Sequence, residues 1–229
     1  SKKLILILKN SEMKVLNSKS LFFFTLFFLI HSSTYAQQYA AELIPKSLKS
    51  RATAVVRDEV VNIDMKNESN ISHHITKAVT VLNKSGDQHG ALTLFYDKTK
   101  SIKDIKGLIY DEFGKQIGKF SVKDFKDYSA TDQVSMFDDI RVKHYAPNVY
   151  TYPYTVVYTY EVKHNQNLFI PYWRPNVQAD LAIEKSSFTF SSNSNLKLRL
   201  KSQHVLEPTI HEDNGKTTTY TWTVSNINA

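Results

Sequence analysis

Cysteine is absent from this 229-residue chain, and glycine is scarce, with six residues. Without cysteine the chain has no disulfide, no thiol nucleophile and no zinc–thiolate site. Its stability must therefore come from a hydrophobic core. The six glycines form neither a glycine-rich phosphate loop nor a Gly-x-Ser-x-Gly elbow, so the motifs of nucleotide-binding proteins and of serine hydrolases are missing.

The chain also lacks an apolar run long enough to cross a bilayer, which takes roughly 20 helical residues. The apolar run Leu21 to Ile30 spans ten residues, follows Lys14 and Lys19, and precedes the small residues Thr34 and Ala36. A basic start, a short apolar stretch and small residues before a cleavage site are typical of a secretory signal peptide. We expect cleavage after Ala36; a permanent anchor is the alternative.

This expectation divides the chain. Residues 1–36 are assigned to the signal peptide, with a doubtful place for residues 1–12 because Met13 is the natural start. Residues 37–50 are assigned to an N-terminal linker, and residues 51–229 to the mature domain. After processing no stable transmembrane segment would remain, so we expect an exported protein, periplasmic or secreted into the cell envelope.

The loss of the signal peptide lowers the charge. The whole chain carries a formal net charge of +7, and residues 1–36 hold five lysines and one acidic residue. The remaining 24 basic and 21 acidic residues leave +3. A balance this small does not suggest a nucleic-acid partner.

The dominant period from Arg51 onward is two, which is typical of strands with one buried face. Val61, Ile63 and Met65 alternate with polar residues, and the longest alternation runs from Tyr150 to Lys163. Further strands are expected at 52–57, 71–82, 91–96, 105–110, 140–145, 168–172, 181–190, 196–201 and 219–224. Many strands without intervening helices predict an all-β fold, an antiparallel β-sandwich preceded by the signal-peptide helix.

Two glycine-containing segments, 83–87 and 111–114, are predicted to close hairpins, because glycine adopts positive φ at little cost. The segment 121–129 and the stretch before Arg51 are possible short helices, although neither has a strong apolar stripe.

A specific resemblance is carried by an ordered series of motifs. They are Asp138-Asp139-Ile140-Arg141-Val142-Lys143, Tyr152-Pro153-Tyr154-Thr155-Val156-Val157-Tyr158, Leu168-Phe169-Ile170-Pro171-Tyr172-Trp173-Arg174-Pro175 and Tyr220-Thr221-Trp222, with the turns 83–87 and 111–115 before them. In this order they resemble domain of unknown function 3857, an exported β-sandwich that precedes transglutaminase-like domains in Gram-negative bacteria. The resemblance spans roughly Arg51 to Ala229.

The resemblance implies a partner: a downstream transglutaminase-like domain with a Cys-His-Asp triad. The chain stops at Ala229, about where the accessory domain of the family ends, so no triad residue can be carried over. We therefore expect no enzyme activity from this segment, and transglutaminase-like or peptidase activity only if the protein continues.

A stripe of aromatic residues suggests a binding surface, because exposed rings stack on sugars. The candidate binding residues are Tyr152, Tyr154, Tyr158, Tyr160, Trp173 and Arg174. The alternative is that these rings form the core of the sandwich and that Trp173 packs over a sheet end. No catalytic, metal-binding or cofactor-binding residue is predicted.

Titratable residues offer weaker candidates. His73 and His74 are adjacent, and neighbouring strand residues point to opposite faces, so one metal site cannot easily use both. The remaining histidines after residue 36 are scattered singly, and a surface position is expected for each. Asp138 and Asp139 are expected to form a turn in which Arg141 pairs locally.

Two functions follow from these observations. The first is a non-catalytic accessory module that positions a transglutaminase-like domain or its protein or peptide substrate. The second is a stand-alone envelope module that binds an envelope protein, a peptide or a glycan through its aromatic face. A hydrolase lacks a supporting constellation of residues.

Overall fold

The computed structural model describes residues 38–130, 139–166, 172–175, 178–196, 198–213 and 215–229. The predicted signal peptide, residues 1–36, lies outside the described residues. Eleven strands and five short helical segments make up the described chain. The strands are β1 (Ala54–Asn67), β2 (Asn70–Val81), β3 (Leu92–Tyr96), β4 (Lys100–Tyr110), β5 (Gln116–Ser121), β6 (Lys126–Ser129), β7 (Arg141–Tyr145), β8 (Tyr154–His164), β9 (Leu181–Asn193), β10 (Thr209–Asp213) and β11 (Thr217–Ile227). The helical segments are η1 (Ala41–Leu43), α2 (Lys46–Lys49), η2 (Lys84–Gly86), α3 (Asp87–Gly90) and η3 (Val122–Asp124).

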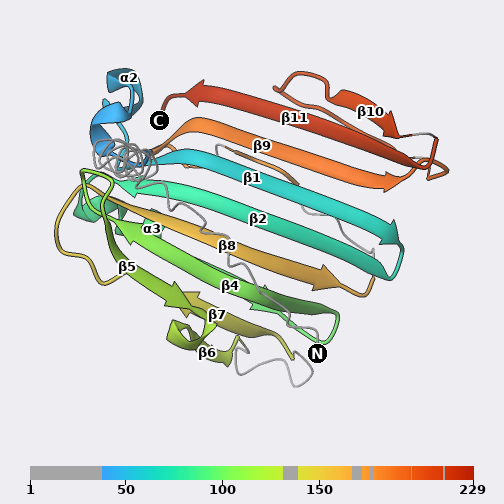
Figure 1. Ribbon diagram of the computed structural model, residues 1–229, viewed down its shortest axis with the longest axis horizontal. Helices are drawn as coiled ribbons and strands as arrows, with labels where there is room; N and C mark the ends of the chain where they lie inside the picture. Colours follow the sequence, from blue (N-terminus) through green and yellow to red (C-terminus); the bar gives the residue numbers. More distant parts are fainter. Residues whose placement is uncertain (1–37, 131–138, 167–171, 176–177, 197, 214) are drawn as a thin grey trace, which may run out of the picture. The chain divides into compact units, whose positions relative to one another are not determined.

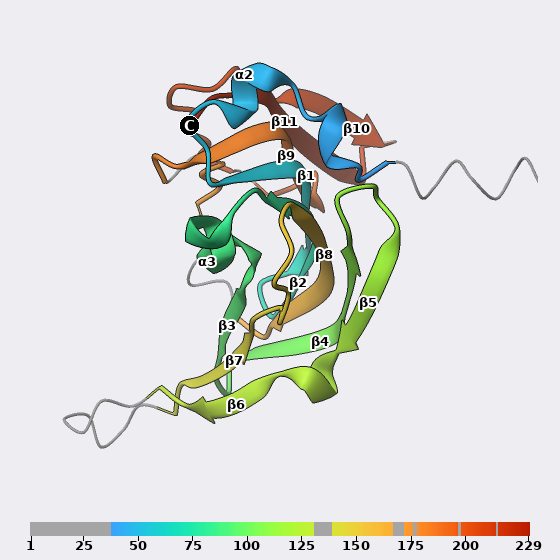
Figure 2. The ribbon, with the colours of Figure 1, turned by 90° about the vertical axis from the view of Figure 1, so that its left-hand side faces the viewer.

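The strands form two sheets that pack together, which confirms the predicted all-β sandwich. The large sheet has the order β10-β11-β9-β1-β2-β8-β4-β5 (Figure 1), and the small sheet has the order β3-β7-β6. Figure 2 shows the large sheet edge-on, with the small sheet against one of its faces. Neighbouring strands are antiparallel, except that β1 runs parallel to β9. The sandwich is therefore mixed at its centre rather than wholly antiparallel.

Tight turns set the register of two long hairpins. Between β1 and β2, the Asn67 side chain accepts a hydrogen bond from the Ser69 backbone N–H at 2.9 Å. Between β4 and β5, Asp111 accepts from the backbone of Phe113 and Lys115, and Gly114 has φ of 82°. Only glycine adopts that angle without strain, which explains why the predicted hairpin at 111–114 forms.

The other predicted hairpin, at 83–87, does not form. Asn83 caps η2 by accepting from the Ser85 backbone N–H at 3.0 Å, and α3 follows directly. This helical connection carries the chain from β2 in the large sheet to β3 in the small one. The chain does leave its strand at this segment, as predicted, but asparagine favours helix caps as well as hairpin turns.

Two further strand predictions need correction. The strand predicted from Tyr150 begins only at Tyr154, because Pro153 has no N–H to donate to a ladder. The alternation at 196–201 is not a strand in its described residues; Leu196 and Leu198 pack against the cluster of Ile63, Met65, Ile71 and Phe190. The strand predicted at 168–172 lies almost wholly outside the described residues.

The main core lies between the two sheets. Its most buried large side chains include Tyr154, Val156 and Tyr158 of β8, each 2% exposed or less, and Ile183 of β9. The small sheet contributes Leu94 to the same cluster. Burial of one such aromatic or aliphatic side chain contributes about 1.5–3 kcal/mol.

Residues 38–50, assigned to a linker from the sequence, pack on the opposite face of the large sheet. Ile44 and Leu48 are 2% and 1% exposed and contact Val55 and Ala182 in a second hydrophobic cluster. The buried Arg57 guanidinium donates to the backbone carbonyls of Gln38 at 3.4 Å and Ala40 at 3.2 Å. This segment is therefore part of the folded domain.

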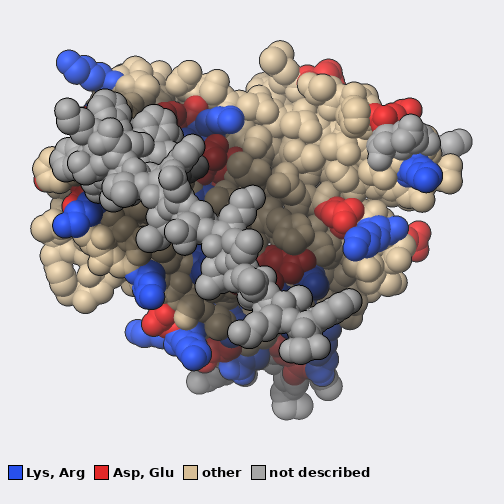
Figure 3. Space-filling view, viewed as in Figure 1, with Lys and Arg blue, Asp and Glu red and all other residues tan. Residues whose placement is uncertain are grey.

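Acidic and basic side chains are interspersed on the face drawn in Figure 3. Strands β9 and β11 are joined by uncharged pairs: the Ser191 and Thr219 hydroxyls lie 2.9 Å apart, and those of Thr189 and Thr221 lie 3.4 Å apart. None of the helices in the described part of the chain has the length and hydrophobicity needed to cross a membrane.

Candidate functional site

The six residues predicted from the sequence as a binding surface separate into two groups. Tyr154 and Tyr158 are buried in the main core. Tyr152 precedes β8, and its hydroxyl donates to the two carboxylate oxygens of Asp87 at 2.9 and 2.8 Å. Tyr160, Trp173 and Arg174 instead line a cavity. The aromatic stripe is thus core at one end and cavity wall at the other.

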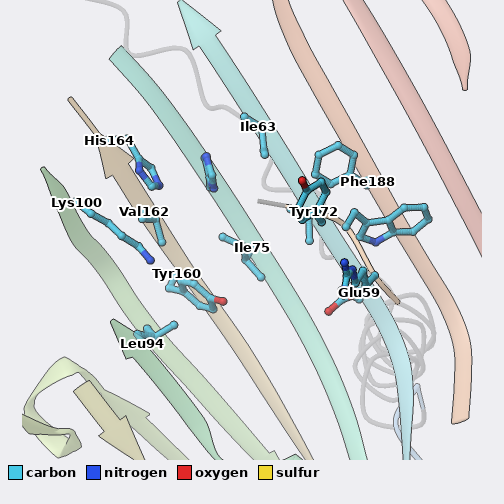
Figure 4. A pocket seen from close by; sticks show the side chains of 14 residues that line it. Glu59, Ile63, Ile75, Leu94, Lys100, Tyr160, Val162, His164, Tyr172 and Phe188 are labelled. Atoms are coloured by element: carbon cyan, nitrogen blue, oxygen red, sulfur yellow. The ribbon is translucent and has the colours of Figure 1, made fainter. Parts of the chain in front are cut away.

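The cavity has a volume of about 290 Å³ and lies over the inner face of the large sheet (Figure 4). It is built from alternate residues of β1, β2 and β8, because every second side chain of a strand points to the same face. One residue each from β3, β4 and β9 and a short segment before β9 complete it. The lining residues are Glu59, Val61, Ile63, His73, Ile75, Leu94, Lys100, Tyr160, Val162, His164, Tyr172, Trp173, Arg174 and Phe188.

An acidic corner is held by Glu59 of β1. One carboxylate oxygen forms an ion pair with the Lys77 amino group at 2.9 Å, and the other accepts from the Ser186 hydroxyl at 2.7 Å. The Trp173 indole N–H donates to the same Ser186 oxygen at 3.1 Å, and its ring stacks on Phe188 at 6.0 Å between centroids. Both oxygens of this carboxylate are therefore engaged by the protein itself.

A pair of histidines forms the other end. The rings of His73 on β2 and His164 on β8 lie 4.5 Å apart between centroids. Burial, and then the neighbouring His164 and Lys100, lower the pKa of His73 to about 4. Burial and the charge of Lys100 also lower the pKa of His164. His73 is therefore neutral at pH 7.

The Nε2 atom of His164 is buried and has no hydrogen-bond partner in the described part of the protein. Lys100 of β4 lies directly across from His164 in the strand register, and burial lowers its pKa. On the opposite neighbour, β2, Ile71 pairs with His164, so the histidine lies between a cationic and an apolar residue.

Tyr172 and Arg174 line the cavity from the segment before β9, and Tyr160 lines it from β8. The Arg174 guanidinium lies over the exposed Tyr172 ring, 5.4 Å from its centroid. Burial, and then the charge of Glu59, raise the pKa of Tyr160 to about 12. Its hydroxyl is therefore protonated at neutral pH and can donate a hydrogen bond.

The sequence model of domain of unknown function 3857 (DUF3857), a domain with a solved structure, matches residues 68–229. This chain belongs to the DUF3857 family. The family name assigns no activity, but it agrees with the resemblance predicted from the motifs between Val81 and Trp222.

Solved structures extend the comparison of this DUF3857 domain. The crystal structure of a "putative protease" from Parabacteroides distasonis ATCC 8503 is 11% identical, with a TM-score of 0.61 over 77% of this chain and 36% of that one. An M1 zinc metallopeptidase from Deinococcus radiodurans is 10% identical, with a TM-score of 0.36 over 75% of this chain and 39% of that one. Leukotriene A4 hydrolase from Saccharomyces cerevisiae is 15% identical, with a TM-score of 0.35 over 82% of this chain and 31% of that one.

These likenesses concern the fold. The DUF3857 chain spans little more than a third of the length of the Parabacteroides protein, whose fold it shares. The other two structures are only weakly similar, with TM-scores of 0.36 and 0.35. No curated protein matches the chain.

The other titratable candidates of this DUF3857 domain lie away from the cavity or apart from one another. His74 points away from His73, toward Glu161 at 3.6 Å, as expected for neighbours in a strand. The local pairing expected for Arg141 is not made with Asp139: Arg141 donates to Asp127 at 2.8 Å, and Asp139 pairs with Lys98. Asp138 lies outside the described residues.

Two histidines that were expected at the surface are not free surface residues. His89 has a side chain only 4% exposed, and its Nε2 lies 3.0 Å from Asp180, which also accepts from the Thr53 hydroxyl at 2.6 Å. This cluster joins α3 to the starts of β1 and β9. His164 is the second, because it lies beside His73 in the cavity wall.

The polar side chains at the Glu59 end of the cavity are hydrogen-bonded to one another, whereas the His164 Nε2 atom has no partner among the described residues. The side chain near the cavity whose type most resembles a catalytic nucleophile is that of Ser186. Its hydroxyl donates a hydrogen bond to Glu59 and accepts one from Trp173. Among the residues that the structure describes, no group of three or more histidine, aspartate or glutamate side chains could hold a metal ion. What the cavity offers is apolar walls, two cationic side chains and an unpaired histidine nitrogen.

Sequence reasoning missed Glu59, His164 and Lys100 as parts of this site. Each is a single polar residue in an alternating strand, and they are up to 105 positions apart along the chain. They come together only because β1 pairs with β2, and β8 pairs with β2 and β4. The sequence offered one signal: in the alternation of each strand, these residues occupy the positions whose side chains point inward.

Proposed function

We propose that this DUF3857 domain is a non-catalytic accessory domain of a longer exported protein, in which it positions a transglutaminase-like domain or that domain's protein or peptide substrate. The observation that carries the proposal is the fold likeness to the Parabacteroides protein, in which a domain of this kind takes up only 36% of the chain. That protein is described as a "putative protease", which suggests a role for this domain beside amide-bond chemistry.

The side chains are consistent with a supporting role. Amide cleavage or transfer needs an activated nucleophile together with a base and a charge-stabilising site. In the described cavity, the rings of the two histidines lie 4.5 Å apart between centroids, and neither forms a hydrogen bond to a described hydroxyl group. The family motifs supply no catalytic residue either.

The test has a genetic and a physical part. The coding sequence beyond Ala229 should contain a cysteine, followed by a histidine and an aspartate, in the order of a transglutaminase-like triad. The downstream domain, produced separately, should form a complex with this chain in sedimentation analysis and gain a lower KM for protein substrates. An immediate stop codon would contradict the proposal. So would an active downstream domain whose KM for protein substrates is the same with and without this chain.

The proposal includes export. The apolar run Leu21 to Ile30 and the small residues before Gln37 support removal of residues 1–36. Mass spectrometry of the protein from an envelope fraction should find an N-terminus at Gln37. A mature protein that retains Leu21 to Ile30 would favour a membrane-anchored form.

A second candidate function is a stand-alone binding module of the cell envelope. The specific observation in its favour is the cavity, in which Tyr160, Trp173 and Arg174 come together. Binding of a small ligand by this chain alone, without any downstream domain, would support this role; its ligand class is argued next.

A further inference from the structure

The cavity is small for a ligand site. Pockets for drug-sized molecules measure roughly 300–1,000 Å³, and this one measures about 290 Å³. It therefore accommodates one side-chain-sized group rather than an extended oligosaccharide or a peptide strand. The figure shows its apolar wall, which is formed by Ile75, Val162 and Phe188 among others (Figure 4).

The charged groups around the cavity favour an anion. Lys100 and Arg174 line it, whereas its one acidic lining residue, Glu59, is neutralised by Lys77 and hydrogen-bonded to Ser186. A cationic ligand would have to displace these partners. An anionic ligand meets no free carboxylate in the described wall.

The Lys100 side chain has no ion-pair partner among the described residues. Its amino group makes no hydrogen bond or ion pair to any described residue, although it is half-buried. Asp97, whose charge acts on Lys100, uses one oxygen to accept from the Thr99 hydroxyl and from the backbone N–H groups of Thr99 and Lys100. A partly desolvated cation that forms no ion pair with a described residue is a strong anchor for a carboxylate.

His164 supplies a second contact. Its Nε2 atom is buried without a partner, and such an atom is costly to leave unsatisfied. In the tautomer that carries the proton on Nε2, and with the imidazole ring turned toward the cavity, it would donate to a ligand oxygen. Lys100 and His164 face each other across neighbouring strands, so one carboxylate could accept from both.

We infer that this cavity binds a carboxylate carried by a single apolar group, with the carboxylate at Lys100 and His164 and the apolar group against Ile75, Tyr160 and Phe188. Two sources share this chemistry: the C-terminal residue of a peptide, and a free aromatic or aliphatic acid. The inference rests on the second candidate function, binding by this chain. It is independent of the complex with a downstream domain, so the two can fail separately.

The test is isothermal titration calorimetry on the chain at neutral pH with two probes that differ in charge alone. N-acetyl-L-phenylalanine should bind about tenfold or more tightly than N-acetyl-L-phenylalaninamide, because hydrogen bonds to a charged group are the stronger ones. Equal affinities for the two probes, or no binding of either at millimolar concentration, would overturn the inference. This comparison needs no variant.

A matched pair of variants then locates the contact. Lys100→Met retains the aliphatic stem, and it should abolish the preference for the acid. Lys103→Met removes a lysine from the opposite face of the same strand, where it pairs with Glu161 in register, and should leave the preference intact. Thermal unfolding of both variants verifies folding, and an equal loss of preference in both would contradict the assignment.

Octanoate distinguishes the two sources. Competition by octanoate at similar concentration assigns the site to free acids in general, whereas binding of N-acetyl-L-phenylalanine without competition by octanoate assigns it to peptide C-termini. Either result retains the proposed contact at Lys100 and His164.

Discussion

The buried Arg57 provides the sharpest prediction about the fold, because it joins the N-terminal segment to the sheet. Its guanidinium pairs with Glu184 at 2.6 Å and donates to the carbonyl of Ala40 at 3.2 Å and of Gln38 at 3.4 Å. Its side chain is 6% exposed. Arg57→Met retains most of the buried stem and removes all of these hydrogen bonds at once.

The expected loss of unfolding free energy depends on the Glu184 carboxylate, which loses its ion-pair partner in this variant. Breaking a buried ion pair by removing one partner costs about 3–5 kcal/mol when the other charge stays buried. The Glu184 side chain is 30% exposed, so water can partly solvate it. We therefore expect a loss at the lower end, about 3 kcal/mol. For a domain of this size that lowers Tm by about 6–12 °C.

The assay is urea unfolding followed by circular dichroism, with limited proteolysis to follow residues 38–50. Arg51→Met, at an exposed position just before β1, serves as the control and should change the unfolding free energy by less than about 0.5 kcal/mol. Loss of equal size in both variants, or an Arg57→Met protein as stable as the parent, would refute the account of the N-terminal segment.

Three further predictions concern side chains between the sheets and in the cavity. Tyr158→Ala should cost about 3–5 kcal/mol, whereas Tyr158→Phe should be neutral or stabilising in the same unfolding experiment, because the Tyr158 hydroxyl is buried without a hydrogen-bond partner in the described protein. The pKa of His73 is lowered to about 4 in the folded protein, so the unfolded chain takes up a proton first as the pH falls. Unfolding curves should therefore show a free energy of unfolding that is constant above about pH 6.5 and that declines toward pH 4 by at most about 3 kcal/mol. The substitution His73→Gln should flatten that decline. Gly107→Ala should destabilise by about 1–3 kcal/mol in thermal unfolding, because an added Cβ would lie 2.0 Å from the Phe120 ring, whereas Gly118→Ala, whose Cβ would meet Ile109 at 3.3 Å, should cost less.

The sequence predicted most strands, because alternation fixes which residues face inward. It could not predict which strands pair. β1 lies beside β9 in parallel, with Ala54 opposite Leu181, and nothing local in either strand specifies a partner 127 positions away. Buried polar residues were also hidden: Arg57 sits at a register shift in β1, where the strand pattern gives no reason to expect a buried charge.

The candidate site was predictable only in part. Tyr160 was predicted from the alternation of tyrosines along its strand, and Trp173 and Arg174 were predicted separately as an adjacent aromatic and cationic pair. Lys100 and His164 were not, since their importance comes from the cross-strand register alone. Single polar residues form a binding site only when strand pairing brings them together, and one sequence alone does not show which strands pair.

The central proposal is that this domain supports amide-bond chemistry performed by another domain. The most direct measurement compares this chain with the longer gene product on unfolded protein and cell-wall peptide substrates, scoring both product release and amine incorporation. We predict turnover by the longer product and none by residues 1–229. Turnover by this chain alone, abolished by substitution of His73 or His164, would contradict the account.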